Sequence, residues 1–311
     1  MSPEVQRAAE ILKRGGLVAF PTETVYGLGA DASSKDAVAR LYAAKRRPTD
    51  HPVIVHFASA QAAFEWAREV PQGARALAAK FWPGPLTMIL KRSSKAGDFV
   101  TGGQDTVGLR VPRHPVAQQL LHAFGGGIAA PSANRFGQVS PTTAAHVRQD
   151  LGEDVDLVLD GGPSEVGIES TIVDLSGTQP VLLRPGRVSA AALEEALGAR
   201  IESKQTDSPR HSGGLERHYA PKTPAKLVPT HELDQHIARL KDKVAVLAFS
   251  RPDEHVDFWL RMPRDPAAYA QKLYAALREL DTAHCEMILI EAPPDAPEWA
   301  GVRDRLVRAT G

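Results

Sequence analysis

The chain of 311 residues has a single cysteine, no apolar run long enough to span a membrane, and no net charge. The one cysteine, Cys285, excludes an internal disulfide and a multi-cysteine zinc cluster, and its place at the start of the apolar run CEMILIEA indicates a buried thiol. Lysine plus arginine equals aspartate plus glutamate at 37 each, so any anion site must be local. Because the N-terminus lacks a signal-peptide apolar run, we expect a cytoplasmic protein with no membrane contact.

The common catalytic and nucleotide-binding signatures are also missing. There is no GxxxxGK[ST] phosphate loop, and the three glycines at 125–127 do not extend to GxGxxG. Neither a GxSxG nucleophile elbow nor an HExxH zinc motif occurs. If the protein binds an anion, we therefore expect side chains and helix ends, rather than one of these loop motifs, to hold it.

What is present is a chain of ordinary globular composition, with 43% hydrophobic and 24% charged residues, long enough for about two domains. Residues 201–224 are polar and rich in glycine, proline and histidine, which predicts a linker between an N-terminal domain (1–200) and a small C-terminal α/β domain (225–311). Alternation of strands and helices after the linker favours a mainly parallel sheet. Periodicity and capping signals predict helices over 4–14, 36–47, 60–69, 73–81, 141–149, 189–197, 267–280 and 298–308, and strands over 17–20, 52–57, 86–91, 106–111, 128–130, 156–159, 170–175, 181–184, 226–228, 244–249 and 287–291.

The stretch KRRPTDHPVIVH, residues 45–56, gathers three cations before a turn bracketed by Pro48 and Pro52. A rigid turn with clustered charge suits a phosphate. Cations in the last turn of a helix also complement its dipole, so a purely structural role is the alternative. His56 lies near the end of the following strand, where a lone histidine is more often structural than functional.

Other polar side chains stand beside predicted strands. Thr24 follows the first strand, where it could bind a ligand or make a local turn hydrogen bond. Arg110 lies inside a strand and needs a partner if buried, either a ligand carboxylate or an internal acidic residue. Ser140 before Pro141 predicts a helix N-cap, and the same helix end could hold a phosphate. These residues predict an anion-binding α/β protein, with a nucleotide-dependent transferase as one possibility.

Seven motifs in order carry a resemblance to a known family: LVAFPTETVYGLGAD, KRRPTDHPVIVH, WPGPLT, VGLRVPRH, PSANRFGQVSPT, STIVDL and LLRPG. Together with the linker ERHYAPKTP, they resemble the YrdC-like family in its long, two-domain form. The resemblance implies a twisted mixed-sheet N-terminal domain and a small Rossmann-like α/β C-terminal domain. It also implies a nucleotidyltransferase that converts L-threonine, bicarbonate and ATP to threonylcarbamoyl-AMP and pyrophosphate.

The resemblance assigns roles by position. The family's KxR and SxN signature stands here as Lys45, Arg47, Ser132 and Asn134, with Lys45 and Arg47 as the catalytic cations. His51 replaces the asparagine common in the family. The residues that resemble the threonine-binding set are Thr24, His56, Arg110, Ser132 and Ser170. Those that resemble the ATP-binding set are Arg47, His51, Thr106, Ala130, Ser140, Arg184 and Tyr219. Mg²⁺ is expected to arrive with ATP, without a dedicated protein cage.

The resemblance further implies a tRNA-modifying transferase that accepts the product, for modification of the adenosine beside the anticodon. A non-catalytic RNA-binding module of the same fold is the alternative, which the balanced net charge weakens, and a weak tRNA contact is compatible with both. A related carbamoyl-transfer enzyme of hydrogenase maturation needs zinc fingers that one cysteine cannot supply. Within the linker, Tyr219 is interpreted as part of a lid over the nucleotide or as a strut between domains.

Overall fold

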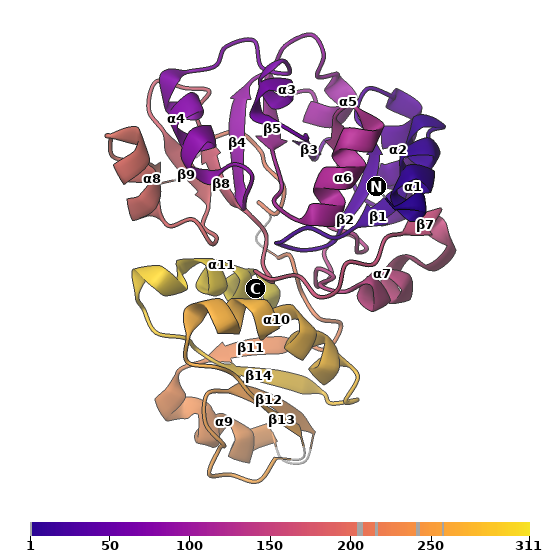
Figure 1. Cartoon of the computed structure of the whole chain (residues 1–311). Helices are drawn as coiled ribbons and strands as arrows, with labels where there is room; N and C mark the ends of the chain where they lie inside the picture. The colour runs from indigo at the N-terminus through magenta and orange to yellow at the C-terminus, as the bar shows by residue number, and fades with distance from the viewer. Residues whose placement is uncertain (1, 204–207, 215–216, 241–242, 257) are drawn as a thin grey trace.

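Short apolar runs of the first two hundred residues build a ten-stranded sheet, seen at the top of Figure 1. The computed structural model describes residues 2–203, 208–214, 217–240, 243–256 and 258–311. The strand order is β10-β9-β8-β4-β5-β3-β6-β2-β1-β7. The strands are β1 (Val18–Phe20), β2 (Gly27–Asp31), β3 (Ile54–His56), β4 (Leu86–Lys91), β5 (Thr106–Arg110), β6 (Ile128–Ala129), β7 (Leu157–Val158), β8 (Thr171–Asp174), β9 (Val181–Arg184) and β10 (Glu202–Ser203).

The sheet combines parallel and antiparallel pairs, which confirms the expected mixed architecture. β3 pairs with β5 in parallel, whereas β4 runs antiparallel to β5 and parallel to β8. β9 is antiparallel to β8. As a result, the C-terminal ends of β3, β5 and β9 and the N-terminal end of β8 lie on the same side of the sheet, at the ends of its strands.

Helices with serine or threonine N-caps cover the sheet. Ser2, Ser34, Ser59, Thr143 and Ser189 each accept a hydrogen bond from a backbone N–H of the first turn. The helices of this domain are α1 (Pro3–Lys13), α2 (Lys35–Lys45), α3 (Ala60–Phe64), α4 (Gln72–Phe81), α5 (Asp98–Thr101), α6 (Pro115–Phe124), α7 (Ala144–Leu151) and α8 (Ala190–Leu197), with a 3₁₀ turn at Gly152–Asp154. α1 and α6 share one apolar cluster that includes Leu12 and Leu120.

The C-terminal domain is a four-stranded sheet in the order β11-β14-β12-β13, and every pair is parallel, as predicted. Its elements are β11 (Ala225–Val228), α9 (Leu233–Leu240), β12 (Val244–Ala248), β13 (Phe258–Arg261), α10 (Pro266–Asp281), β14 (Met287–Glu291) and α11 (Ala300–Thr310), with 3₁₀ turns at Thr230–Glu232 and Pro297–Trp299. The predicted helical face of Tyr269, Leu273 and Leu277 is buried. In the described part of the chain, no helix has the length and apolar character needed to cross a membrane.

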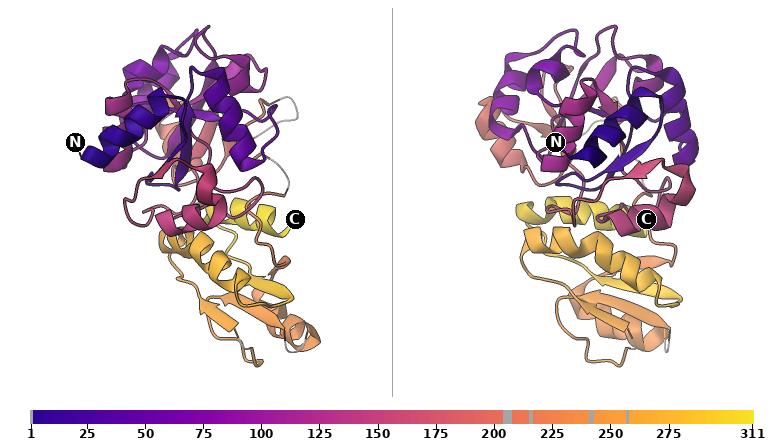
Figure 2. Two further views of the ribbon diagram at one scale, coloured as in Figure 1. Left: turned by 90° about the vertical axis from the view of Figure 1, so that its right-hand side faces the viewer. Right: turned by 45° about the vertical axis from the view of Figure 1, so that its right-hand side comes forward.

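Helices α10 and α11 lie between the small sheet and the N-terminal domain (Figures 1 and 2). Arg278 of α10 donates to Asp150, with Nη1–Oδ1 at 2.9 Å, and to the Val139 carbonyl. Gly167 has φ +79°, and a Cβ there would meet the Gln271 Cα at 2.4 Å. Only glycine allows α10 to approach this loop so closely.

Several local predictions need correction. Ser140 does not cap a helix: α7 begins three residues later behind Thr143, because the Ser140 hydroxyl donates to Glu169 instead. The helix predicted over 60–69 ends at Phe64. β2, α5, α6, α9 and β13 were not predicted. Part of the predicted linker forms regular secondary structure, since Glu202–Ser203 pairs with β9 and extends the first sheet as β10. Of its residues, 204–207 and 215–216 lie outside the described ranges.

The close approach at Gly167 generates a stability prediction. Gly167→Ala should lower the free energy of unfolding by about 3 kcal/mol, since a left-handed backbone strain is added to a steric clash with α10. Gly125→Ala is the matched control, because Gly125 also has φ +79° but open space around its Cβ position. Chemical denaturation should show a cost of only about 1 kcal/mol for the control. Equal losses for both variants would mean that α10 does not press on Gly167.

Candidate active site

A cavity opens where the loops and strand ends of the N-terminal domain meet the linker. It is lined by Thr22, Thr24, Val25, Gly27, Arg47, Ile54, His56, Arg110, Ala130, Pro131, Ser132, Glu169, Ser170, Arg184, Ser212, Gly213, His218 and Tyr219. All five residues of the expected threonine set are among them. Of the expected ATP set, Arg47, Ala130, Arg184 and Tyr219 are present.

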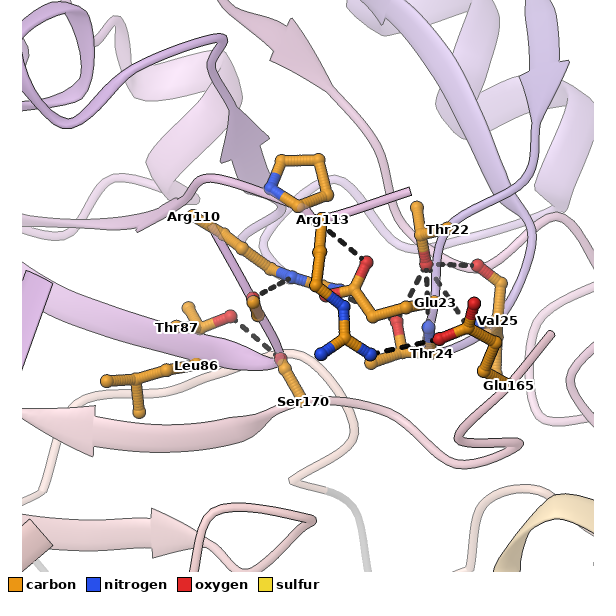
Figure 3. Close-up of polar contacts among 12 residues, drawn as sticks. Thr22, Glu23, Thr24, Val25, Leu86, Thr87, Arg110, Arg113, Glu165 and Ser170 are labelled. Carbon is orange, nitrogen blue, oxygen red and sulfur yellow. Dashed lines mark hydrogen bonds and ion pairs between the residues drawn. The ribbon is translucent and has the colours of Figure 1, made fainter. Parts of the chain in front are cut away.

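At the end of β5, Arg110 is held by the loop that follows β1 (Figure 3). Its Nη2 lies 2.7 Å from Glu23 Oε1, and its Nη1 donates to Thr24 Oγ1 at 2.9 Å. Burial disfavours the Glu23 carboxylate, but the charge and hydrogen bonds of Arg110 outweigh burial and lower its pKa. The partner of Arg110 is therefore an internal glutamate. Sequence reasoning left this choice open and did not single out Glu23, although PTETVY places a carboxylate between the two threonines.

The Arg110 guanidinium keeps capacity for a ligand. Nε donates to the Gly84 carbonyl at 3.3 Å, so three of the five N–H groups that an arginine carries are used. Since Arg110 also lines the cavity, the remaining N–H groups can receive an anion such as a carboxylate.

His56, at the end of β3, is a neutral imidazole. Burial and the charge of Arg110 lower its pKa to about 3. Its Nδ1 is buried and has no hydrogen-bond partner among the described residues, which is costly unless a ligand supplies one. A neutral ring suits an uncharged ligand group such as a hydroxyl.

Ser170 and Arg184 meet at the edge where β8 begins and β9 ends. The Ser170 Oγ lies 2.8 Å from Thr87 Oγ1 (Figure 3), and Arg184 Nε donates to the Ser170 carbonyl at 3.0 Å. Arg184 Nη1 reaches the linker, donating to the Ser212 carbonyl at 2.8 Å and to the Tyr219 hydroxyl at 3.2 Å. The linker thus forms one wall of the cavity.

Lys45 and Asn134 lie beneath the cavity rather than in its lining. Lys45 is 1% exposed, and its ammonium donates to the backbone carbonyls of Ser132 and Asn134. Burial, reinforced by the charge of Arg47, lowers its pKa well below the usual range. The Asn134 amide in turn donates to the carbonyls of Arg135 and Gln138. Lys45 therefore fixes the loop that carries Ser132, and its direct contact with phosphate stays a prediction.

The other expected nucleotide residues, His51, Thr106 and Ser140, are not among the residues that line the cavity. Arg47 lies within it, donating to the Pro52 carbonyl at 2.8 Å and stacking over the Phe136 ring at 5.5 Å. His51 packs edge-on against the same Phe136 ring, with 5.3 Å between the ring centroids. Thr106 lines a small adjoining pocket with Gln104 and Ile54. Ser140 is buried behind Glu169.

The lining residues suit anions and do not suit a protein-held cation. Among the described residues, three arginines line the cavity, and both oxygens of the one lining carboxylate, Glu169, already accept hydrogen bonds. Over the described ranges, no group of three or more His, Cys, Asp or Glu side chains is placed to hold a metal ion.

Fold and cavity define a two-domain α/β protein with an arginine-lined cavity, suited to small anions, beside the strand ends of a mixed sheet. A family model described as "Telomere recombination", for Sua5, YciO and YrdC, matches residues 10–186, and a model described as "Threonylcarbamoyl-AMP synthase, C-terminal domain" matches residues 188–311. The chain belongs to this Sua5/YrdC family, in its two-domain form.

Relatives match over nearly the whole length. The chain is 38% identical to the threonylcarbamoyl-AMP synthase of Pyrococcus abyssi over 99% of this chain and 94% of that protein. It is also 38% identical to the enzyme of the same name from Bacillus subtilis, covering 99% and 93%. The crystal structure of P. abyssi Sua5 complexed with L-threonine superposes with a TM-score of 0.92 at 38% identity, covering 98% of this chain and 94% of that one.

The buried neutral histidines generate a pH prediction. Burial also lowers the pKa of His218 to about 3, so His56 and His218 both bind protons less readily folded than unfolded. Their stabilising contribution is complete above the unfolded pKa of about 6.5 and is lost as pH falls toward 3. Between about pH 7 and pH 5, each should cost about 2 kcal/mol of unfolding free energy.

His56→Gln tests this linkage. Urea denaturation at several pH values should show about 2 kcal/mol less acid destabilisation in the variant than in the unmodified protein. His122→Gln, which changes an exposed imidazole, should retain the full pH dependence. If His56→Gln behaves like this control, His56 is not a buried neutral group.

Proposed function

We propose that this protein synthesises threonylcarbamoyl-AMP from L-threonine, bicarbonate and MgATP, with release of pyrophosphate. The observation that carries the proposal is the convergence of Thr24, His56, Arg110, Ser132 and Ser170 on one cavity beside the cations Arg47 and Arg184. The relatives named threonylcarbamoyl-AMP synthase and the threonine complex of P. abyssi Sua5 support it.

The reaction joins two anions. The threonine amine and bicarbonate condense with loss of water to a carbamate, whose oxygen attacks the α-phosphorus of ATP. A P–O bond forms there while the bond to the leaving pyrophosphate breaks. No side-chain nucleophile is required, so catalysis depends on positioning and on charge neutralisation.

The cavity residues divide these tasks. The free N–H groups of Arg110 suit the threonine carboxylate, and the unpaired Nδ1 of neutral His56 suits its hydroxyl. Arg47 and Arg184 neutralise the phosphates. Lys45 acts through the loop it supports, keeping Ser132 toward the substrates. Mg²⁺ enters as part of the MgATP substrate.

The product is a mixed anhydride that water attacks readily. The linker residues Ser212, Gly213 and Tyr219 line the cavity, which supports a covering role for the linker. Tyr219 also contacts the C-terminal domain, with its ring 5.9 Å from that of Tyr274, so it serves as lid and strut together.

The consumer of the product is a transferase that modifies the adenosine beside the anticodon of tRNA, and the site of action is the cytoplasm. Direct tRNA contact is weak in this scheme. Tight tRNA binding with a steep salt dependence, together with absent turnover, would instead favour the RNA-binding module.

The purified protein should release pyrophosphate from MgATP only when both L-threonine and bicarbonate are present. A coupled pyrophosphate assay, with threonine replaced by serine or omitted, measures this dependence. Release at the same rate without threonine would contradict the proposed function.

A further inference from the structure

Glu169 lies in the cavity wall, where the charges of two arginines from different domains act on it. Its Oε2 accepts from Arg305 Nε of α11 at 2.7 Å and from the Tyr274 hydroxyl of α10 at 2.9 Å. Its Oε1 accepts from Ser140 Oγ at 2.6 Å. Two helices of the C-terminal domain therefore contact a side chain that lines the N-terminal cavity.

The Arg305 side chain is fully buried and joins the two loops that bear cavity residues. Its Nη2 donates to the Glu169 carbonyl at 3.1 Å, next to Ser170, and its Nη1 donates to the Pro185 carbonyl at 3.0 Å, next to Arg184. Close backbone packing supports this contact, since a Cβ on Gly301 would come within 3.2 Å of the Gly186 Cα.

Arg184 meets only neutral acceptors in the described part of the chain. These are the Ser170 carbonyl and hydroxyl, the Ser212 carbonyl and the Tyr219 hydroxyl. The charge of Arg184 nevertheless reaches Glu169, because burial opposes ionisation of this carboxyl while Arg305 and Arg184 both lower its pKa. The charges of two arginines thus act on the Glu169 carboxylate. The arginine that forms an ion pair with it, Arg305, comes from the C-terminal domain.

We propose that Arg305 is a positioning residue for the nucleotide: by neutralising Glu169 it keeps the charge of Arg184 available for the phosphates of MgATP. This inference rests on the proposed function in taking MgATP as the ligand of Arg184. Without Arg305, Glu169 would be a buried carboxylate, Arg184 would be the other arginine whose charge acts on it, and the two would pair. The C-terminal domain is then part of the nucleotide site, although it contributes no phosphate contact.

Charge-specific variants test this proposal. Arg305→Met should weaken MgATP binding, measured by titration calorimetry, at least tenfold. Adding Glu169→Gln to Arg305→Met removes the competing carboxylate and should restore the affinity to within about threefold of the unmodified protein, because a neutral pair can replace a buried ion pair with little loss of stability. A purely structural contact predicts no such rescue.

Two further variants complete the set. Arg303→Ala changes an arginine of the same helix that pairs with Asp295 away from Glu169, and it should leave MgATP affinity unchanged. Arg305→Lys keeps the charge and loses the fork that holds the two loops, so it should bind MgATP within about threefold of the unmodified protein. If Arg305→Met does not fold, the MgATP affinities of Arg305→Lys and of the double variant test the proposal. A purely structural role of Arg305 predicts weak MgATP binding in both variants, whereas the proposal predicts nearly normal binding.

An unchanged MgATP affinity in folded Arg305→Met, or a double variant as weak as the single one, would overturn the inference. The crystal structure of Arg305→Met gives a reading that does not depend on the proposed function. Movement of Arg184 onto Glu169 supports the proposal, whereas Arg184 retained on Ser212 and Tyr219 overturns it. Absence of MgATP binding by the unmodified protein would contradict the proposed function alone. The crystal structure of Arg305→Met would still show whether Arg184 pairs with Glu169 when Arg305 is missing.

Discussion

The ion pair between Arg110 and Glu23 constrains the whole substrate cavity, because two buried charges can coexist there only while they face each other. Arg110 ends β5, and Glu23 belongs to the loop after β1, so the pair ties together strands that are separated in the sheet. The same carboxylate accepts from the Arg113 backbone at 3.0 Å, which fixes the turn beyond β5. Thr24 is thereby held against Arg110, and burial together with the charge of Arg110 lowers the pKa of His56 and keeps its ring neutral.

The same rule operates at the domain boundary. Glu169 and Arg305 are buried together, and their contact places α11 beneath the loops that carry Ser170 and Arg184. Over the described ranges, the cavity has one cation that is paired with an internal carboxylate, Arg110, and two, Arg47 and Arg184, whose hydrogen bonds go to neutral groups. A reaction that brings a carbamate to a triphosphate needs such uncompensated cations. The C-terminal domain therefore influences the reaction because its Arg305 neutralises the Glu169 carboxylate in the cavity wall.

Much of this arrangement could be predicted from the sequence. The parallel sheet after the linker and the mixed fold were confirmed, since apolar runs and turn residues are local signals. The cavity gathers every residue expected to bind threonine. Ser140 was wrongly taken as a helix cap, because its partner Glu169 is distant in the sequence and a capping pattern cannot reveal it. Glu23 and Arg305 were missed for the same reason: each is explained by a long-range partner, and Arg305 lies in a helix with an ordinary surface pattern.

The central claim is that one cavity joins the threonine carbamate to the α-phosphate of ATP. Incubation of the protein with ¹⁴C-threonine, bicarbonate and ATP labelled with ³²P at the α position, followed by rapid chromatography, tests it directly. The account predicts a single species that carries both labels in equal amounts and appears together with pyrophosphate. Labels that never occur in the same species, while ATP is consumed, would contradict it.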